Sequence, residues 1–474
     1  MFIGREKELK ILREALQSPE AEMVSIIGRR RVGKTFLVRK AFEDVLAFEM
    51  TGIQSGTLKE QLANFASQLN LTAKPPAPMK APGSWLEAFR MLIHYFENTP
   101  LAGKPVVFFD ELPWLATRKS DFIKGLGYFW NSWASRKNVV VVICGSAASW
   151  MIQKVVQDKG GLHNRITRHL QLQPFTLRET EQFLAARGLN LDRYQIVQLY
   201  AAMGGIPHYL KEIRRGESAA QNIDRICFEP SGLLFAEFER LYPALFVNAG
   251  NHVALVRALA SRSSGLTRNE LLAAAKIPNG GGATKSLDEL VQSGFVSQFF
   301  PYNRSKKDLL FRLTDEYSLF YLRFIENLRM EGPGIWQNFQ QTPTYATWSG
   351  FAFENLCLKH VVQIKKALGI AGVFATSSAF YQKGKDGMDG CQIDLLIDRN
   401  DQVVNLCEIK FYNTEIVLTK EMAAGLRRKI MLFKHYSGTR KQVFLTFISA
   451  FGVAGNQHST GLVDADLTLD DLFG

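Results

Sequence analysis

The sequence predicts a multidomain α/β protein. Its 474 residues are enough for roughly three or four domains of ordinary size. Short apolar strands alternate with helical segments in the first part of the chain and again in the last part, which is typical of α/β domains. The hydrophobic fraction of 46% and the charged fraction of 22% are ordinary for a globular protein with several packed cores.

Composition and charge exclude several classes of protein. No apolar run approaches the ~18–20 residues that a membrane span needs, and the N-terminus does not resemble a signal peptide. The five cysteines are scattered without a C-x-x-C pair, as in a reducing cytoplasm. The net charge of +12 favours a polyanionic partner, most often nucleic acid, although many basic chains bind none. We therefore expect a cytoplasmic protein with no membrane partner.

The strongest motif lies near the N-terminus. An apolar strand, Met23–Ile27, is followed by a loop that reads G-x-x-x-x-G-K-[ST] from Gly28 to Thr35, and then by a helix. Backbone N–H groups of such a loop and helix start face phosphates. Lys34 can reach the β- and γ-phosphates, and the Thr35 hydroxyl can bind Mg²⁺. The sequence thus predicts an ATP site that includes Gly28, Gly33, Lys34 and Thr35.

Two further strands end in polar residues. The strand Val106–Phe109 runs into Asp110 and Glu111. A carboxylate at the C-terminal end of a strand lies at the crevice where open α/β sheets bind ligands. We expect Asp110 to hold Mg²⁺, directly or through water, and Glu111 to polarise the attacking water. A third strand, 139–146, places Ser146 where a polar group can sense the γ-phosphate.

Residues 1–330 resemble the archaeal-type ATPases of the AAA+/STAND group of P-loop NTPases. The segment FIGREKEL resembles their opening motif, which implies that Arg5 lies near the nucleotide. NRITRHLQLQPFTLRE resembles their segment with an arginine ahead of a strand; Arg165 matches that arginine best, and Arg168 is second. MGGIPHYL resembles their lid motif, which implies that Pro207 contacts the base or ribose. His208 follows where some members carry a sensor arginine, which favours a slow switch over fast, oligomer-coupled turnover.

Residues 176–245 are expected to form a helical lid, because Thr176 and Glu179 make a capping box at its start. The next segment, 246–330, reads helix, helix, turn, helix and β-hairpin, the order of a winged helix-turn-helix. Its third helix, 284–293, would be the recognition helix, with Lys285 able to meet phosphates.

The charges of this winged segment do not decide whether it binds DNA or packs against protein. The predicted wing carries Arg304, Lys306 and Lys307, which also suit phosphates. Asp288 and Glu289, however, lie on the third helix and would repel DNA. Packing within the chain, or against another protein, is therefore the alternative to DNA contact.

The last domain contains a hairpin with charges in apolar strands. Residues 389–412, DGCQIDLLIDRNDQVVNLCEIKFY, read as two strands joined by a polar turn, with Asp394 in the first and Glu408 and Lys410 in the second. Two-residue alternation places Glu408 and Lys410 on one face, and antiparallel pairing can bring Asp394 close to them. We expect the two carboxylates to share Mg²⁺ or Mn²⁺. Lys410 would orient a water or stabilise charge on a phosphate.

This D-x(13)-E-x-K pattern resembles the PD-(D/E)xK nuclease superfamily, and the nuclease-like domain often fused behind archaeal-type ATPases. Glu354, on the preceding helix, matches the superfamily's helix-borne glutamate. The proline of the motif is absent before Asp394. A simple salt bridge between Asp394 and Lys410 would give the same pattern.

The predicted fold is thus an α/β multidomain chain with a P-loop ATPase core (1–175), a helical lid (176–245), a winged helix-turn-helix (246–330) and a small restriction-endonuclease-like domain (331–474). The leading hypothesis is a Mg²⁺-dependent, ATP-hydrolysing switch that controls a nucleic-acid-directed, nuclease-like effector. The alternatives are a DNA-binding regulator with an inactive nuclease fold and a nucleotide-dependent protein-interaction scaffold. Expected partners are ATP or ADP, nucleic acid with DNA favoured over RNA, and further copies of the chain in a nucleotide-dependent homo-oligomer.

Overall fold

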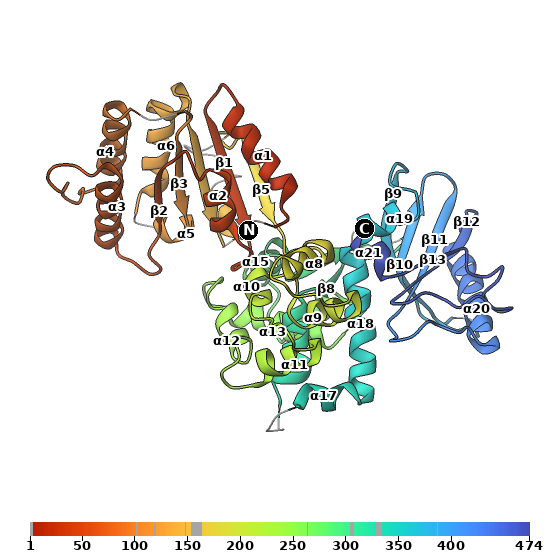
Figure 1. Ribbon diagram of the computed structural model, residues 1–474. Coiled ribbons are helices and arrows are strands. Elements are labelled where there is room, and N and C mark those ends of the chain that lie inside the picture. Colours follow the sequence, from red (N-terminus) through yellow and green to blue (C-terminus); the bar gives the residue numbers. More distant parts are fainter. Residues whose placement is uncertain are drawn as a thin grey trace. The chain divides into compact units, whose positions relative to one another are not determined.

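The chain divides into two compact units, Met1–Pro174 and Phe175–Gly474 (Figure 1). The computed structural model describes residues 3–100, 103–117, 120–146, 148–152, 164–262, 264–303, 308–328, 334–385 and 387–474. Among these residues, no helix is both long enough and apolar enough to cross a membrane.

A parallel sheet of five strands forms the centre of the first unit, in the spatial order β2-β3-β4-β1-β5. The strands are β1 (Glu22–Gly28), β2 (Leu46–Thr51), β3 (Val106–Asp110), β4 (Val140–Gly145) and β5 (Arg168–Leu172). The three central strands β1, β3 and β4 are buried along their whole length, as continuous apolar runs in parallel sheets usually are. Their carboxyl ends share one edge of the sheet, and the loops that follow them therefore meet there.

Helices surround this sheet, and local sequence signals start two of the longest. A capping box between Thr57 and Glu60 begins α3, and the Ser84 hydroxyl caps α4. The helices are α1 (Glu6–Gln17), α2 (Lys34–Ala41), α3 (Leu58–Ala73), α4 (Trp85–Asn98), α5 (Leu112–Leu115), α6 (Phe122–Ser132) and α7 (Ala148–Met151).

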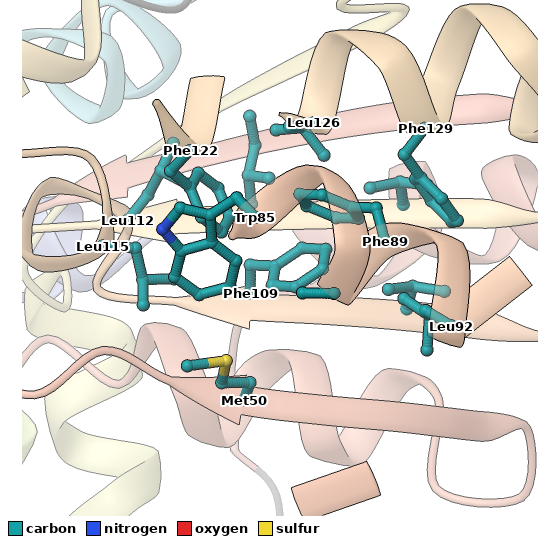
Figure 2. Close-up of a cluster of buried hydrophobic side chains, with 14 of the residues drawn as sticks. Met50, Trp85, Phe89, Leu92, Phe109, Leu112, Leu115, Phe122, Leu126 and Phe129 are labelled. Atoms are coloured by element: carbon teal, nitrogen blue, oxygen red, sulfur yellow. The ribbon is translucent and has the colours of Figure 1, made fainter. Parts of the chain in front are cut away.

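An aromatic cluster packs α4 and α6 onto β3, and Figure 2 shows its side chains. Trp85 and Phe122 meet edge to face with ring centroids 4.6 Å apart, and Phe89 lies 5.7 Å from Phe109. Such pairs add about 0.5–1.5 kcal/mol each beyond the area they bury. The cluster therefore holds β3, and the carboxylate at its end, firmly in the sheet.

The second unit begins with helices α8 (Leu177–Ala185), α9 (Arg193–Met203), α10 (Pro207–Leu210), α11 (Ala219–Ile223) and α12 (Glu237–Leu241). The predicted capping box is confirmed, because the Thr176 hydroxyl accepts from the Glu179 backbone N–H and the Glu179 carboxylate accepts from that of Thr176. The segment predicted as a separate lid is thus part of the second unit.

A helical segment with a β-hairpin follows. Its helices are α13 (Gly250–Ala260), α14 (Arg268–Ala275), α15 (Gly281–Gln292) and α16 (Glu316–Phe320), and its strands are β6 (Leu266–Thr267), β7 (Val296–Phe299) and β8 (Leu310–Leu313). The antiparallel sheet has the order β6-β8-β7. The elements follow the order expected for a winged helix-turn-helix, with α15 in the place of the third helix.

The second unit ends in a mixed sheet of five strands with the order β13-β12-β11-β10-β9. The strands are β9 (Ala375–Gln382), β10 (Cys391–Arg399), β11 (Val403–Lys410), β12 (Gln442–Ser449) and β13 (Ala465–Leu467). The helices are α17 (Ile335–Gln340), α18 (Pro343–Lys359), α19 (Val361–Ala367), α20 (Lys420–Ser437) and α21 (Leu469–Phe473). Strands β9, β10 and β11 are antiparallel, and β11, β12 and β13 are parallel. The predicted hairpin is confirmed as β10 and β11.

Candidate functional site

The predicted phosphate loop connects β1 to α2. Gly28 ends β1 so close to β5 that an added Cβ would lie 2.6 Å from the Leu172 carbonyl oxygen. Gly33 has φ of 93°, a left-handed conformation that suits glycine, at the N-cap of α2. These two glycines let the loop turn tightly and point the start of α2 into the crevice.

Lys34 is the first residue of α2, and its side chain lies in this crevice with only 5% of its surface exposed. Its Nζ donates to the carbonyl oxygens of Gly28 and Arg29 at 3.0 and 3.1 Å, and to Ser146 Oγ at 3.0 Å. Burial lowers the pKa of Lys34, while Glu111 and Asp110 act in the opposite direction. All three hydrogen-bond partners are neutral, and the positive charge of Lys34 is therefore available to an anion.

Thr35 and Asp110 come together across the crevice, where Thr35 Oγ1 donates to Asp110 Oδ2 at 2.6 Å. Burial at the end of β3 raises the pKa of Asp110, although its hydrogen bond to Thr35 lowers it in part. A hydroxyl and a carboxylate at this distance are oxygen donors of the kind that Mg²⁺ prefers. The residues therefore fit the Mg²⁺ that the sequence predicts for this loop.

Glu111 is held in place by the end of β4. Its Oε1 accepts from Ser146 Oγ at 2.5 Å, and its Oε2 accepts from the Ser146 backbone N–H at 3.2 Å. Glu111 has φ of 49° and ψ of 51°, a left-handed conformation that is uncommon outside glycine. Residues in such strained conformations are often found at functional sites. Lys34, Ser146 and Glu111 thus form one hydrogen-bonded chain beside the Thr35–Asp110 pair.

The predicted Arg5 also lies at the loop. It is 5% exposed, has φ of 61° at the start of α1, and donates to the carbonyl oxygen of Val32 at 3.4 Å. Residues far apart in the sequence, from the first helix, the loop and two strand ends, are thus gathered at one edge of the sheet.

The two candidate arginines differ in their surroundings. Arg168, at the start of β5, pairs with Glu14 at 3.4 Å and with Glu22 at 3.3 Å. Arg165 is exposed and, within the residues that the structure describes, makes no hydrogen bond or ion pair. Arg168 therefore has two structural partners, and the preference for Arg165 as the arginine that meets the phosphate stays a prediction.

Pro207 is the first residue of α10 in the second unit. The glycines before it have structural roles within that unit. A Cβ on Gly205 would lie 2.0 Å from the carbonyl oxygen of Phe175, and Phe175 N donates to Gly205 O at 2.7 Å. The glycines of the predicted lid motif thus allow the end of α9 to pack against the backbone before α8.

Comparison with known proteins finds similarity over the part of the chain that contains this candidate site. Residues 2–213 match the sequence model of a family described as an ATPase domain predominantly from Archaea. This stretch is an ATP-binding, Walker-type ATPase domain. The match ends after α10 and therefore includes the first helices of the second unit.

Relatives of the ATPase domain extend the comparison to the rest of the chain. An uncharacterised protein of Methanocaldococcus jannaschii is 24% identical over 448 residues, which cover 91% of this chain and 92% of that protein. An uncharacterised ATP-binding protein of the same organism is 41% identical over 44 residues, 9% of this chain and 75% of that protein. The solved Walker-type ATPase of Pyrococcus abyssi has a TM-score of 0.51 and 19% identity, and covers 68% of this chain and 96% of that one.

The second predicted site, in the C-terminal domain, is arranged differently. Glu354 on α18 accepts from Arg312 Nη2 at 3.3 Å. Burial and the nearby Asp394 carboxylate raise the pKa of Glu354 to about 7, against the opposing charges of Arg312 and Lys410. Asp394 itself accepts from Gln392 Nε2 at 3.0 Å. Glu354, Asp394 and Arg312 therefore form one cluster.

Glu408 belongs to a second cluster. Its Oε1 pairs with Lys410 at 2.9 Å and its Oε2 with Lys429 of α20 at 2.6 Å. Burial alone would raise the pKa of Glu408, but Lys429 and Lys410 outweigh burial and lower it. Lys410 also interacts electrostatically with Glu354, and the two clusters are therefore neighbours.

The sharing of one cation by Asp394 and Glu408 stays a prediction. The pairing of β10 with β9 is irregular between Ile393 and Leu396, and both of these residues join the same hydrophobic core. Regular alternation would place residues three apart on opposite faces, and the parity that predicted the position of Asp394 therefore fails there.

The C-terminal residues do not fit a resident metal ion as they are arranged here. The described residues contain no group of three or more His, Cys, Asp or Glu side chains that could hold one. Instead, side-chain cations from three elements, Arg312 of β8, Lys410 of β11 and Lys429 of α20, neutralise the carboxylates. Sequence reasoning missed Arg312 and Lys429, although Arg312 is a lone charge in the apolar strand LLFRL.

The winged segment contacts the C-terminal domain through its hairpin, for which DNA contact and packing within the chain were the two alternatives. Tyr302 N donates to Ala379 O at 2.8 Å, and the Tyr302 ring lies 5.6 Å from that of Phe433. Arg304, Lys306 and Lys307 of the predicted wing lie outside the described residues. This end of the hairpin therefore packs within the chain.

On α15, the acidic residues that argued against DNA contact have unequal surroundings. Glu289 pairs with the buried His252 at 2.8 Å and lies 3.9 Å from Lys285. Asp288 is exposed. Only part of the acidic charge expected on this face is therefore directed to solvent.

Proposed function

We propose that the protein is a Mg²⁺-dependent switch that binds and hydrolyses ATP and thereby controls its C-terminal, nuclease-like domain. The observation that carries the first half is the convergence of Thr35–Asp110 with the chain Lys34–Ser146–Glu111 at one crevice. Thr35 and Asp110 would hold Mg²⁺, which neutralises phosphate charge when bound. Lys34 would contact the β- and γ-phosphates.

The positions of the remaining residues of this crevice suggest their roles. Glu111 would orient the attacking water, and Ser146, which touches both Glu111 and Lys34, would sense the γ-phosphate. Arg5 would lie near the nucleotide, Arg165 would meet the γ-phosphate, and Pro207 would contact the base or ribose. The roles proposed for Arg165 and Pro207 rest on the family resemblance.

Contacts within the second unit support the link from ATP to the effector. The backbone N–H of Leu177, at the start of α8, donates to His360 Nε2 at the end of α18, at 3.2 Å. Arg193 of α9 pairs with Asp470 of α21 at 2.7 Å. The helices included in the ATPase match are thus joined to the C-terminal domain, and a nucleotide-dependent shift of α8 and α9 would be passed to it.

Two features support nucleic acid, DNA before RNA, as the target of the effector. The chain has a net charge of +12. The order α18, α19, β9, β10, β11, α20, β12 resembles that of a PD-(D/E)xK domain, with Glu354 on α18, Asp394 on β10, and Glu408 and Lys410 on β11. Glu354, Asp394, Glu408 and Lys410 would be the catalytic groups, with Asp394 and Glu408 as Mg²⁺ or Mn²⁺ ligands after a rearrangement.

The test is cleavage and binding of duplex DNA, single-stranded DNA and RNA by the full chain, with ATP, ADP or no nucleotide, in Mg²⁺ or Mn²⁺. The proposal expects cleavage that depends on ATP and is lost in Lys410→Ala. A nucleotide-dependent change in oligomeric state would be read from the same samples by light scattering. ATP hydrolysis that leaves every nucleic-acid readout unchanged would refute the link.

A second candidate is a DNA-binding regulator whose nuclease fold is inactive. It is favoured by the neutralisation of Glu354 and Glu408 by Arg312, Lys410 and Lys429. Salt-dependent DNA binding without cleavage under any metal condition would select it. The packing of the hairpin at Tyr302 favours a third candidate, a nucleotide-dependent protein-interaction scaffold, which predicts neither DNA binding nor cleavage.

A further inference from the structure

Arg312 is an unusual residue for a strand of a winged hairpin. Its side chain is 3% exposed, and its guanidinium carbon lies 4.8 Å from the centre of the Phe351 ring. Nη2 donates to Glu354 at 3.3 Å, while the buried Nε has no hydrogen-bond partner among the described residues. Burying a guanidinium costs several kcal/mol unless its charge and its N–H groups are compensated. The single long hydrogen bond does not compensate it fully.

The charge that compensates Arg312 comes from two carboxylates of the C-terminal domain. Both Glu354 and Asp394 interact electrostatically with the guanidinium. Without a cation, these two carboxylates would repel each other in a poorly solvated cluster. The guanidinium therefore pairs with Glu354 at 3.3 Å and supplies positive charge that also acts on Asp394.

The hairpin that carries Arg312 is fixed to the same domain at further points. Pro301 forms a parallel bridge with Ala379 of β9, and Asn303 Nδ2 donates to Ser437 O at 3.3 Å. Just after β8, Glu316 pairs with Lys359 of α18 at 2.5 Å. The segment that carries Arg312 thus contacts the C-terminal domain both before and after Arg312 in the sequence.

We propose that the β7–β8 hairpin is an internal lock, in which Arg312 excludes a divalent cation from Glu354 and Asp394 until the hairpin withdraws. The lock deepens the proposed function, on which it rests, because it names the step by which the effector would be held inactive. Removal of the guanidinium leaves two neighbouring carboxylates whose oxygens suit Mg²⁺ or Mn²⁺.

The experiment measures Mn²⁺ binding to the full, nucleotide-free chain by electron paramagnetic resonance of the free ion. Arg312→Gln is expected to bind Mn²⁺ at least about tenfold more tightly than the unchanged chain, because a like charge no longer repels the ion. Arg312→Lys, which keeps the charge, is the matched control and should behave as the unchanged chain. Arg312→Gln/Asp394→Asn should lose the gain, which separates this site from metal binding at the ATP crevice.

A second variant guards against misfolding of Arg312→Gln. Tyr302→Ala removes a half-buried contact of the hairpin and leaves every charged residue of the cluster in place. It should also tighten Mn²⁺ binding, whereas Tyr381→Ala, an exposed tyrosine of β9, should not. A folded Arg312→Gln with no gain overturns the lock, as does a Tyr302→Ala variant with no gain if Arg312→Gln does not fold. A gain without cleavage supports the lock and counts only against the nuclease part of the proposed function.

Discussion

The two charged sites of this chain differ in how their charges are balanced. In the ATPase domain, Lys34 is hydrogen-bonded to two carbonyl groups and a hydroxyl, and its charge is therefore left for a phosphate. In the C-terminal domain, Glu408 has a lysine on each oxygen and Glu354 has an arginine. At the first site a phosphate would replace neutral hydrogen-bond partners of Lys34, whereas at the second site a cation would have to replace positively charged side chains. Charged residues in a matching pattern thus do not by themselves make an open site.

The sharpest test of the first site is Glu111→Gln. ATP should stay bound, while hydrolysis should slow by roughly 10²–10⁴-fold, the usual contribution of a general base. Steady-state phosphate release, together with ATP affinity from calorimetry, measures both. Glu43→Gln, an exposed glutamate after α2, is the control. Normal turnover in Glu111→Gln would assign the water-orienting role to another residue.

A second test removes the charge that the phosphate loop keeps available. Lys34→Ala should weaken ATP binding by roughly 10–100-fold, as expected for the loss of a charged hydrogen bond. Lys40→Ala, on the same helix but paired with Glu43 at the surface, should bind ATP normally. The affinities of the two variants for a fluorescent ATP analogue are compared. An unchanged affinity in Lys34→Ala would show that the charge of Lys34 does not bind the phosphates.

A third test concerns His360, which joins α8 to α18. Burial lowers the pKa of His360 to about 4 from the unfolded value of 6.5. Between these values the unfolded chain binds more protons, and the stability that neutral His360 contributes is therefore lost as pH falls from about 6.5 towards about 4, on the order of 3 kcal/mol. Urea unfolding at several pH values should show this loss.

The loss should be absent in His360→Asn, because that side chain does not titrate. The control His435→Asn, an exposed histidine of α20, should keep the full pH dependence. An equal slope in all three proteins would mean that the contact between α8 and α18 does not depend on the protonation of His360.

The smallest expected effects separate the two arginines. Arg168→Ala should lower the free energy of unfolding by about 0.2–1 kcal/mol, because it removes partly exposed ion pairs. Arg165→Ala should leave stability unchanged and slow ATP hydrolysis. Thermal unfolding and phosphate release on the same preparations distinguish them, and the reverse result would exchange their roles.

The sequence alone determined the candidate ATP site. Its residues lie at strand ends and in one loop, and a parallel sheet brings such positions to a common edge whatever the details of packing. Lys34, Thr35, Asp110, Glu111 and Ser146 could therefore be predicted without coordinates, and side-chain hydrogen bonds join Lys34 to Ser146, Ser146 to Glu111, and Thr35 to Asp110. The β10–β11 hairpin was predictable too, because its alternation and polar turn are local signals.

Only the tertiary structure decided the state of the C-terminal site. An irregularity in the pairing of β10 with β9, between Ile393 and Leu396, interrupts the alternation of side chains around Asp394. No pattern in the sequence predicts this irregularity. Arg312 and Lys429 reach the carboxylates from elements 42 residues before Glu354 and 21 residues after Glu408. Contacts of this kind depend on how separate elements dock, because a charge is balanced by whatever lies nearest in space and not by its neighbours in the chain.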